Sequence, residues 1–223
     1  MFEKLNCSAI AEFDLCPLGP VLVSGGHSHK TDPTVPDITF MTGFSKNGGI
    51  TEECYVIPGS TVKGVLRHYI QDNYIESQAD VDILFGKITG GAQRSKINFH
   101  DAYAVPETVR SSLRNSTRLD PNNQAPVHHS LNNMEVIEKG VFKAGFQISN
   151  FTQREMEAIL LTLLDINTGA VRFGGKVSRG FGQMYVDNFS MTANKGYSSE
   201  LAPVGQVTFT DIEQAVKYFR EVW

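Results

Sequence analysis

The chain has 223 residues, with 20 Lys and Arg against 24 Asp and Glu, a formal net charge of −4 and a pI near 5.9. This balance argues against a generic basic nucleic-acid binder, whose domain would have a pI above about 9. The apolar content of about 47%, counting Gly and leaving out Tyr, is the ordinary globular value and excludes a disordered chain.

The cysteines and the apolar runs indicate a cytoplasmic protein. Cys7, Cys16 and Cys54 include no Cys-x-x-Cys pair, and one thiol would stay unpaired in any disulfide scheme, which is typical of a reducing compartment. The first residues carry charge without a long apolar run behind them, so no secretory signal is expected. The longest apolar stretch, 158–164, is far shorter than the roughly 20 residues that span a bilayer.

A strand, a long loop and a helix are predicted first. Residues 5–15 alternate between apolar and polar side chains, as in a half-buried strand. Residues 25–55 are rich in Gly and Pro and are expected to form a functional loop. Ser60 or Thr61 should then cap a helix, because apolar residues recur at helical spacing from there as far as Ile70.

The second half predicts further strands and a second loop. Strands are expected at 97–105, in one or two pieces at 135–149, and at 181–192, with a long loop at 114–135.

Two capping boxes mark helices in this half, Thr152 with Glu155 and Thr210 with Glu213. The order strand, helix, strand, strand, helix, strand is the split ferredoxin-like arrangement, so the predicted class is α+β with a closing helix.

Residues 55–67 contain the most informative motif, in which a Pro-Gly turn leads into the first helix. Free N–H groups at a helix start attract anions, and Lys63 and Arg67 share one helix face, so the motif could seat a phosphate. An ordinary solvated helix face with a good cap is the alternative.

Residues 169–182 form a glycine-rich segment containing Lys176 and Arg179. Glycines would let backbone amides approach a ligand. The segment matches neither a P-loop nor a dinucleotide fingerprint, which disfavours a nucleotide-fuelled enzyme; a flexible hairpin is the other interpretation.

These motifs, together with Leu84-Phe85-Gly86 and the strand ending in Asp101-Ala102, resemble those of the RAMP superfamily, and among its members the backbone subunits of type III CRISPR effector complexes. Ile57-Pro-Gly-Ser60 followed by Lys63-Gly64 and Arg67 is similar to the family signature Ile-Pro-Gly-Ser-Ser-Leu-Lys-Gly, with Thr61 and Val62 as departures. The resemblance spans about residues 5–192.

The resemblance implies one domain over 1–223 with an RRM-like core and a thumb-like hairpin at Asn115–Glu135. Such subunits assemble along a CRISPR guide RNA beside other RAMP subunits and the large subunit, and engage target RNA. The RNA-binding residues that it implies are Gly25, Gly26, Ser60, Lys63, Arg67, Arg118, Gly174, Gly175, Lys176, Arg179 and Gly180.

The resemblance also implies cleavage of target RNA by an aspartate in the loop before the Ile-Pro-Gly-Ser motif, where Asp37 and Asp32 are the candidates. Pro33 and Pro36 should hold that segment extended, so we expect both carboxylates to be displayed rather than buried. Asp37 could bind Mg²⁺ or another divalent cation, or help to deprotonate a ribose 2′-OH, leaving a cyclic phosphate and a 5′-OH. Turn capping is the alternative for both residues.

His27 and His29 share this loop and could carry protons or, with Asp32, bind zinc, although no fourth ligand is evident.

Two further functions stay open: a backbone subunit that binds guide RNA without cutting, and a stand-alone ribonuclease that processes guide RNA. Basic residues are concentrated in two segments of this acidic chain: residues 87–118 carry a net charge of +4 and residues 172–196 a net charge of +3.

Overall fold

The structure is a computed structural model that describes residues 4–27, 35–47, 50–87, 91–117, 120, 132–197 and 203–223. In chain order its elements are β1 (Cys7–Pro17), β2 (Ser24–His27), β3 (Ile38–Phe40), β4 (Thr42–Asn47), β5 (Ile50–Ile57), α1 (Gly59–Asn73), α2 (Gln78–Phe85), β6 (Ile97–Phe99), β7 (Ala102–Ala104), the 3-10 helix η1 (Pro106–Thr108), β8 (Arg110–Ser116), β9 (Asn132–Lys139), β10 (Phe142–Ser149), α3 (Gln153–Thr168), the 3-10 helix η2 (Val177–Arg179), β11 (Met184–Tyr197), β12 (Pro203–Phe209) and α4 (Ile212–Glu221). Within these ranges, no helix is long and apolar enough to cross a membrane.

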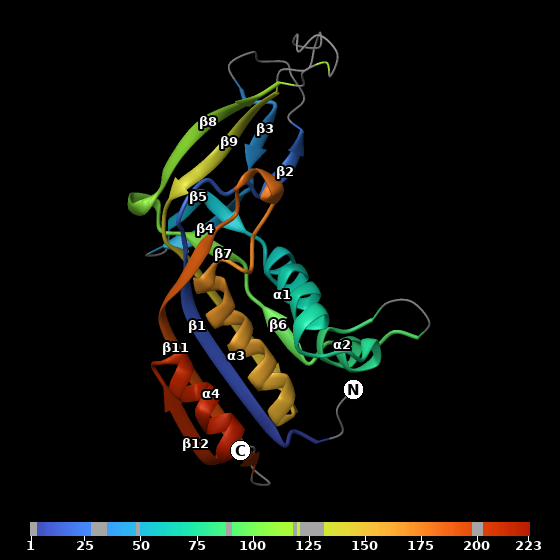
Figure 1. Ribbon diagram of the computed structural model, residues 1–223. Coiled ribbons are helices and arrows are strands. Elements are labelled where there is room, and N and C mark those ends of the chain that lie inside the picture. The colour runs from blue at the N-terminus through green and yellow to red at the C-terminus, as the bar shows by residue number, and fades with distance from the viewer. Residues whose placement is uncertain are drawn as a thin grey trace.

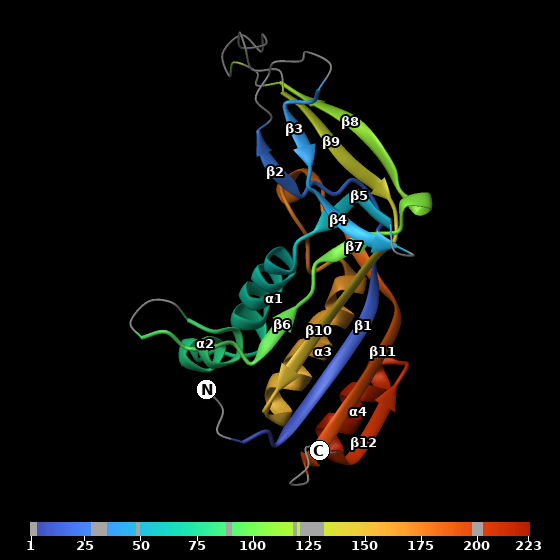
Figure 2. The ribbon, with the colours of Figure 1, turned by 180° about the vertical axis from the view of Figure 1, so that it is seen from behind.

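The main sheet has the strand order β12-β11-β1-β10-β7-β5-β4, and β6 pairs with β10 next to β7. Its central strands β11-β1-β10-β6 are the four strands of the predicted β-α-β-β-α-β unit. Helix α3 covers one face of this sheet: it lies in front of β1 in Figure 1, and β1 and β10 lie in front of it in the view from behind (Figure 2). The predicted α+β, ferredoxin-like fold is confirmed.

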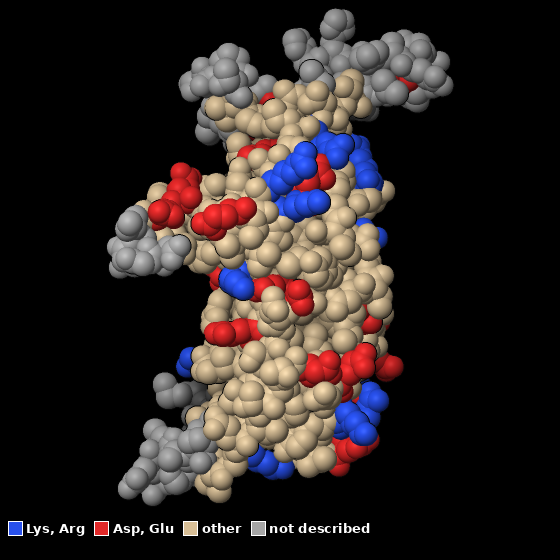
Figure 3. All heavy atoms as spheres, turned by 90° about the vertical axis from the view of Figure 1, so that its left-hand side faces the viewer, with Lys and Arg blue, Asp and Glu red and all other residues tan. Residues whose placement is uncertain are grey.

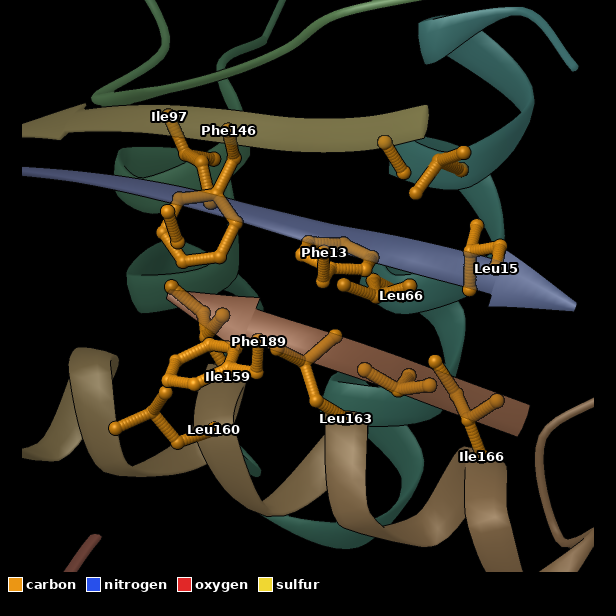
Figure 4. Packing of buried hydrophobic residues seen from close by; sticks show 14 of the residues in the cluster. Phe13, Leu15, Leu66, Ile97, Phe146, Ile159, Leu160, Leu163, Ile166 and Phe189 are labelled. Atoms are coloured by element: carbon orange, nitrogen blue, oxygen red, sulfur yellow. The ribbon is translucent and has the colours of Figure 1, made fainter. Parts of the chain in front are cut away.

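The core lies between this sheet and the helices α1 and α3. Alternate residues of β1, including Phe13 and Leu15, are buried, as the period of two predicts. Leu66 of α1 and Leu163 of α3 point at the same face of β1 beside Phe13 (Figure 4). The capping box of Thr152 and Glu155 begins α3 as predicted.

A second sheet, with the order β2-β3-β9-β8, comes from both regions that were predicted to be loops. Strands β8 and β9 form the stem of the predicted thumb, and the β8–β9 hairpin projects from the end of the molecule opposite β12 (Figures 1 and 2). The predicted bounds of the thumb were too narrow, since pairing runs from Arg110 to Lys139. The prediction of a loop at 25–55 was also wrong: β2 pairs with β3 and β4 with β5, and these pairs join the sheets through distant partners, since β3 pairs with β9 and β5 with β7.

Two local predictions need correction, and two short elements were missed. The strand predicted at 97–105 is broken into β6 and β7 at His100 and Asp101. The final helix is capped by Asp211, whose side chain accepts a hydrogen bond from the N–H of Gln214, and not by Thr210. Helix α2 and strand β12 were not predicted, being short elements without a clear apolar period.

Candidate nucleic-acid interface

The glycine-rich segment packs against the chain just before Gly25 and Gly26. The N–H of Gly175 donates to the Leu22 carbonyl at 2.8 Å, and the N–H of Gly182 donates to the Pro20 carbonyl at 2.9 Å. A Cβ on Gly174 would lie 2.1 Å from the Leu22 oxygen, and its φ of +77° also favours glycine. The structure therefore joins two glycine-containing segments that lie about 150 residues apart in the sequence.

Basic side chains extend from this segment toward the hairpin. Arg179 is exposed, and its Nη1 donates to the Ser116 hydroxyl at the end of β8 at 2.8 Å. Lys176 precedes η2 in a left-handed conformation and is half-buried. Gly174, Gly175 and Gly180 are exposed in the same segment. The predicted RNA-binding residues of the glycine-rich segment are thus gathered at the foot of the hairpin.

Three basic residues on the hairpin itself were missed by the sequence analysis. Arg110 pairs with Lys139 across β8 and β9 just before a shift in register, and Arg114 follows four residues along β8; all three are exposed. The alternation Arg110, Ser112, Arg114, Ser116 could have revealed the two arginines, had residues 110–116 been recognised as a strand.

We call Arg110, Arg114, Lys139, Lys176 and Arg179 the basic strip. Figure 3 shows Lys and Arg atoms gathered over the side of the molecule that β8 forms. One carboxylate lies within it: Glu138 Oε1 is 2.7 Å from the Arg114 guanidinium. The Ser112 hydroxyl, then Arg114, lower the pKa of Glu138, so this carboxylate is ionised and offsets only one of the five cations.

The predicted phosphate seat at the start of α1 is already filled by a side chain of the protein. The Asp101 carboxylate accepts a hydrogen bond from the Gly59 N–H at 2.8 Å, and the N–H groups of Thr61 and Val62 donate to the Pro58 carbonyl. Neither Ser60 nor Thr61 caps the helix, which begins one residue before Ser60. An added phosphate would meet a carboxylate, so the helix N-terminus itself is not the predicted anion site.

Arg67 has two internal acceptors. Its guanidinium donates to the Gly86 carbonyl at 2.8 Å and forms an ion pair with Asp82, which also contacts Lys87 at 3.1 Å. These contacts join α1 to α2. Arg67 is therefore neither a side chain left free for a phosphate nor part of a solvated helix face.

Lys63 lies beside Arg67 in a pocket of about 620 Å³. Partial burial, and then the nearby Arg67, lower the pKa of the Lys63 ammonium. Lys63 forms no ion pair with any described residue, so its ammonium stays suited to an anion.

Asp37 is buried, contrary to the prediction. It is only 7% exposed, and its Oδ2 accepts a hydrogen bond from the Asn133 N–H at 2.8 Å. The contact lies beside the parallel pairing of Ile38 with Met134, so Asp37 fastens β3 to the start of β9. The neighbouring prolines were expected to keep this carboxylate in solvent, but the Asn133 N–H of the hairpin provides a partner that allows it to be buried.

Several predicted residues lie outside the described residues: Asp32, His29 and Arg118, together with the side chain of His27. Carboxylate oxygens suit Mg²⁺. Within the described part of the chain, however, no group of three or more His, Cys, Asp or Glu side chains could hold a metal ion. Among the described residues, Asp37 therefore belongs to no such group of three.

Comparison with known proteins agrees with this architecture. A chain in the cryo-EM structure of the Type III-B Cmr-beta bound to cognate target RNA has a TM-score of 0.59 and 10% sequence identity, with 80% of this chain and 96% of that chain covered. A comparison with curated proteins gives no match. The family model of the RAMP superfamily matches residues 38–185, from β3 to the start of β11. The chain therefore belongs to the RAMP superfamily.

Proposed function

We propose that this chain is a guide-RNA-binding backbone subunit of a type III CRISPR effector complex. The observation that carries the proposal is the basic strip, which continues from the β8–β9 hairpin into the exposed glycine-rich segment. Membership of the RAMP superfamily and the similarity in fold to a chain of an effector assembly support it. The partners proposed with it are guide RNA, target RNA, other RAMP subunits, the large subunit and further copies of this chain.

RNA phosphates are expected along the basic strip. Arg and Lys side chains supply a charge that does not depend on base sequence, and glycine amides admit a close approach of the phosphodiester. Arg110 and Arg179 mark the two ends of this track, and Arg114 lies between them. Lys63 on α1 is proposed as an additional phosphate contact. Arg67 supports it by fixing α1 to α2 through Gly86 and Asp82.

For cleavage of target RNA, we assign different roles to the two aspartates. Asp37 is a positioning residue, because its carboxylate is buried and bonded to the Asn133 amide. Asp32 is then the candidate to accept the proton of a ribose 2′-OH, whose oxygen attacks the adjacent phosphorus in line and displaces the 5′-oxygen. The displaced 5′-oxygen takes a proton from water, so the products would be a 2′,3′-cyclic phosphate and a 5′-OH, and Asp32 returns its proton to solvent. Mg²⁺ stays a predicted cofactor, and no step of this scheme passes through it.

The roles are separated by assembling the complex with Asp32→Ala or Asp37→Asn and following labelled target RNA in Mg²⁺. Asp32→Ala should abolish cleavage while leaving complex assembly and RNA binding unchanged. Asp37→Asn keeps an acceptor for the Asn133 amide and should retain most of the activity. Cleavage at the wild-type rate by both single variants and by the double variant would exclude this loop as the nuclease centre.

A backbone subunit that does not cut is the second candidate, favoured by the burial of Asp37. It predicts guide binding with the same salt dependence and no cleavage in the wild-type complex. A stand-alone processing ribonuclease predicts instead that the isolated chain cuts repeat RNA without partners and without metal.

A further inference from the structure

A pocket of about 560 Å³ lies where β4 and β5 meet the root of the β8–β9 hairpin. Its polar lining includes two carboxylates, Glu53 from β5 and Glu135 from β9, and its apolar lining includes Pro106 and Val109. This volume falls in the range of about 300–1,000 Å³ typical of sites for small ligands. None of its described lining residues is Lys or Arg.

The two carboxylates are held in place by neutral donors. Glu135 accepts a hydrogen bond from the Tyr55 hydroxyl at 2.5 Å and another from the Phe40 N–H at 3.1 Å. Burial, and then the bond to Glu135, raise the pKa of Tyr55, which therefore remains a donor. Glu53 accepts from the Thr42 hydroxyl at 2.7 Å. The carboxylates are thus oriented, and their charges are not neutralised.

Three buried carboxylates elsewhere in the described residues have a cation beside them, whereas the buried Asp37 is held by a backbone amide. Asp14 contacts Lys143 at 2.8 Å, Glu155 contacts Lys96 at 2.8 Å, and Asp82 contacts Lys87 at 3.1 Å. No such ion pair joins Glu53 or Glu135 to any described residue. The half-buried Glu135 and the exposed Glu53 thus face the pocket without a cation from the described residues, and a cation from a partner would pair with both.

We propose that this pocket receives the guanidinium group of an arginine side chain from a neighbouring protein chain. Arginine combines a planar fork of donors with an apolar stem, which matches carboxylates beside the apolar lining of Pro106 and Val109. A nucleotide fits less well because its phosphate would approach two carboxylates. The proposal goes beyond RNA binding and does not depend on it.

The pocket chemistry is tested on the full chain with the peptide acetyl-Gly-Arg-Gly-amide, by NMR shifts of the Phe40 and Ser111 amides. The arginine peptide should bind with a dissociation constant of about 1 mM. The peptide with citrulline, which has the shape of arginine without its charge, should bind about tenfold more weakly. Equal shifts with both peptides, stronger shifts with cytidine monophosphate, or no shift up to about 10 mM would each overturn the proposal.

Variants locate the binding to the carboxylates. Glu135→Gln removes the charge, keeps one oxygen to accept from the Phe40 N–H and offers its NH2 group to the Tyr55 hydroxyl oxygen; it should weaken binding of the arginine peptide about tenfold. Glu53→Gln should weaken binding of the arginine peptide by a similar factor. Glu53 is exposed, so this substitution should leave the fold intact. Glu138→Gln, on the same strand but paired with Arg114, should have no effect; an equal loss there would contradict the assignment.

The partner is tested in the assembled complex. Glu53→Gln with Glu135→Gln should lower the retention of a neighbouring protein subunit, while guide-RNA binding by the isolated chain stays unchanged. Full retention of every protein subunit would overturn the assignment to a protein neighbour and would leave the RNA-binding proposal intact.

Discussion

The Asp101 carboxylate and the Gly59 N–H are 2.8 Å apart, so a residue between β6 and β7 caps the first helix from 42 positions away. A Cβ on Gly59 would lie 2.5 Å from the Phe99 oxygen, which explains glycine at this position. The Pro-Gly motif and the strand ending in Asp-Ala are therefore two halves of one contact, which fixes α1 against the sheet.

Asp101→Ala should lower the free energy of unfolding by about 1 kcal/mol, because the Gly59 N–H loses its acceptor. Asp101→Asn keeps a side-chain oxygen and should lose about half as much. Urea unfolding measures both variants. Equal stability of Asp101→Ala and the wild type would show that the cap contributes nothing.

Gly174→Ala and Gly180→Ala separate close packing from backbone strain. Both glycines have positive φ, but a Cβ at 174 would meet the Leu22 oxygen at 2.1 Å, whereas a Cβ at 180 meets nothing within 4 Å. Gly180→Ala should cost about 1 kcal/mol from strain alone. Gly174→Ala should cost about 3 kcal/mol and weaken RNA binding, because the glycine-rich segment must move. Thermal unfolding and RNA titration check the contrast; similar losses in the two variants would contradict the close approach.

The sequence predicted the central sheet and the main helices because their signals are local. The period of two in β1 and the capping box at Thr152 each lie within a few residues of the element that they mark. Helix α1 was placed correctly, but its cap was not, since Asp101 arrives from another segment. Distant partners also explain why the segment from β2 to β5 was taken for a loop, because β3 joins its sheet through β9 and β5 joins its sheet through β7.

The candidate site was predicted in pieces. The glycines and Lys176 were identified, but the strip is continuous only through the β8–β9 pairing and the contact of Arg179 with Ser116. No spacing rule in the sequence joins residues 110 and 179. The burial of Asp37 could not be predicted either, because its partner, Asn133, lies 96 residues away.

Lys63 and Arg67 should respond differently to loss of charge. Arg67→Gln should cost about 2 kcal/mol of stability, because it removes charged hydrogen bonds to Asp82 and Gly86. Lys63→Gln should leave stability nearly unchanged and reduce the salt slope of RNA binding by about 0.7. Urea unfolding and RNA titrations at several salt concentrations distinguish them. A reversed pattern would mean that Lys63 is the structural residue of the pair.

Glu138 should stabilise the hairpin in a pH-dependent way. Its pKa is lowered in the folded state by the Ser112 hydroxyl and Arg114, so its contribution is complete above the unfolded pKa of about 4.3 and is lost as the pH falls through the folded pKa. Ser112→Ala should raise the Glu138 pKa toward its ordinary value and reduce this acid sensitivity. Carboxyl NMR titration measures the shift; an unchanged Glu138 pKa in Ser112→Ala would rule out the hydroxyl as its cause.

The salt dependence of guide-RNA binding tests the basic strip most directly. The triple variant Arg110→Gln, Arg114→Gln, Arg179→Gln should lower the slope of log K against log salt by about 2, at about 0.7 per lost phosphate contact on single-stranded RNA. A control triple variant at the exposed residues Arg154, Lys217 and Arg220 of α3 and α4 changes the net charge equally and should leave the slope unchanged. Equal slopes in the strip variant and the wild type, or an equal fall in the control, would contradict RNA binding at the strip.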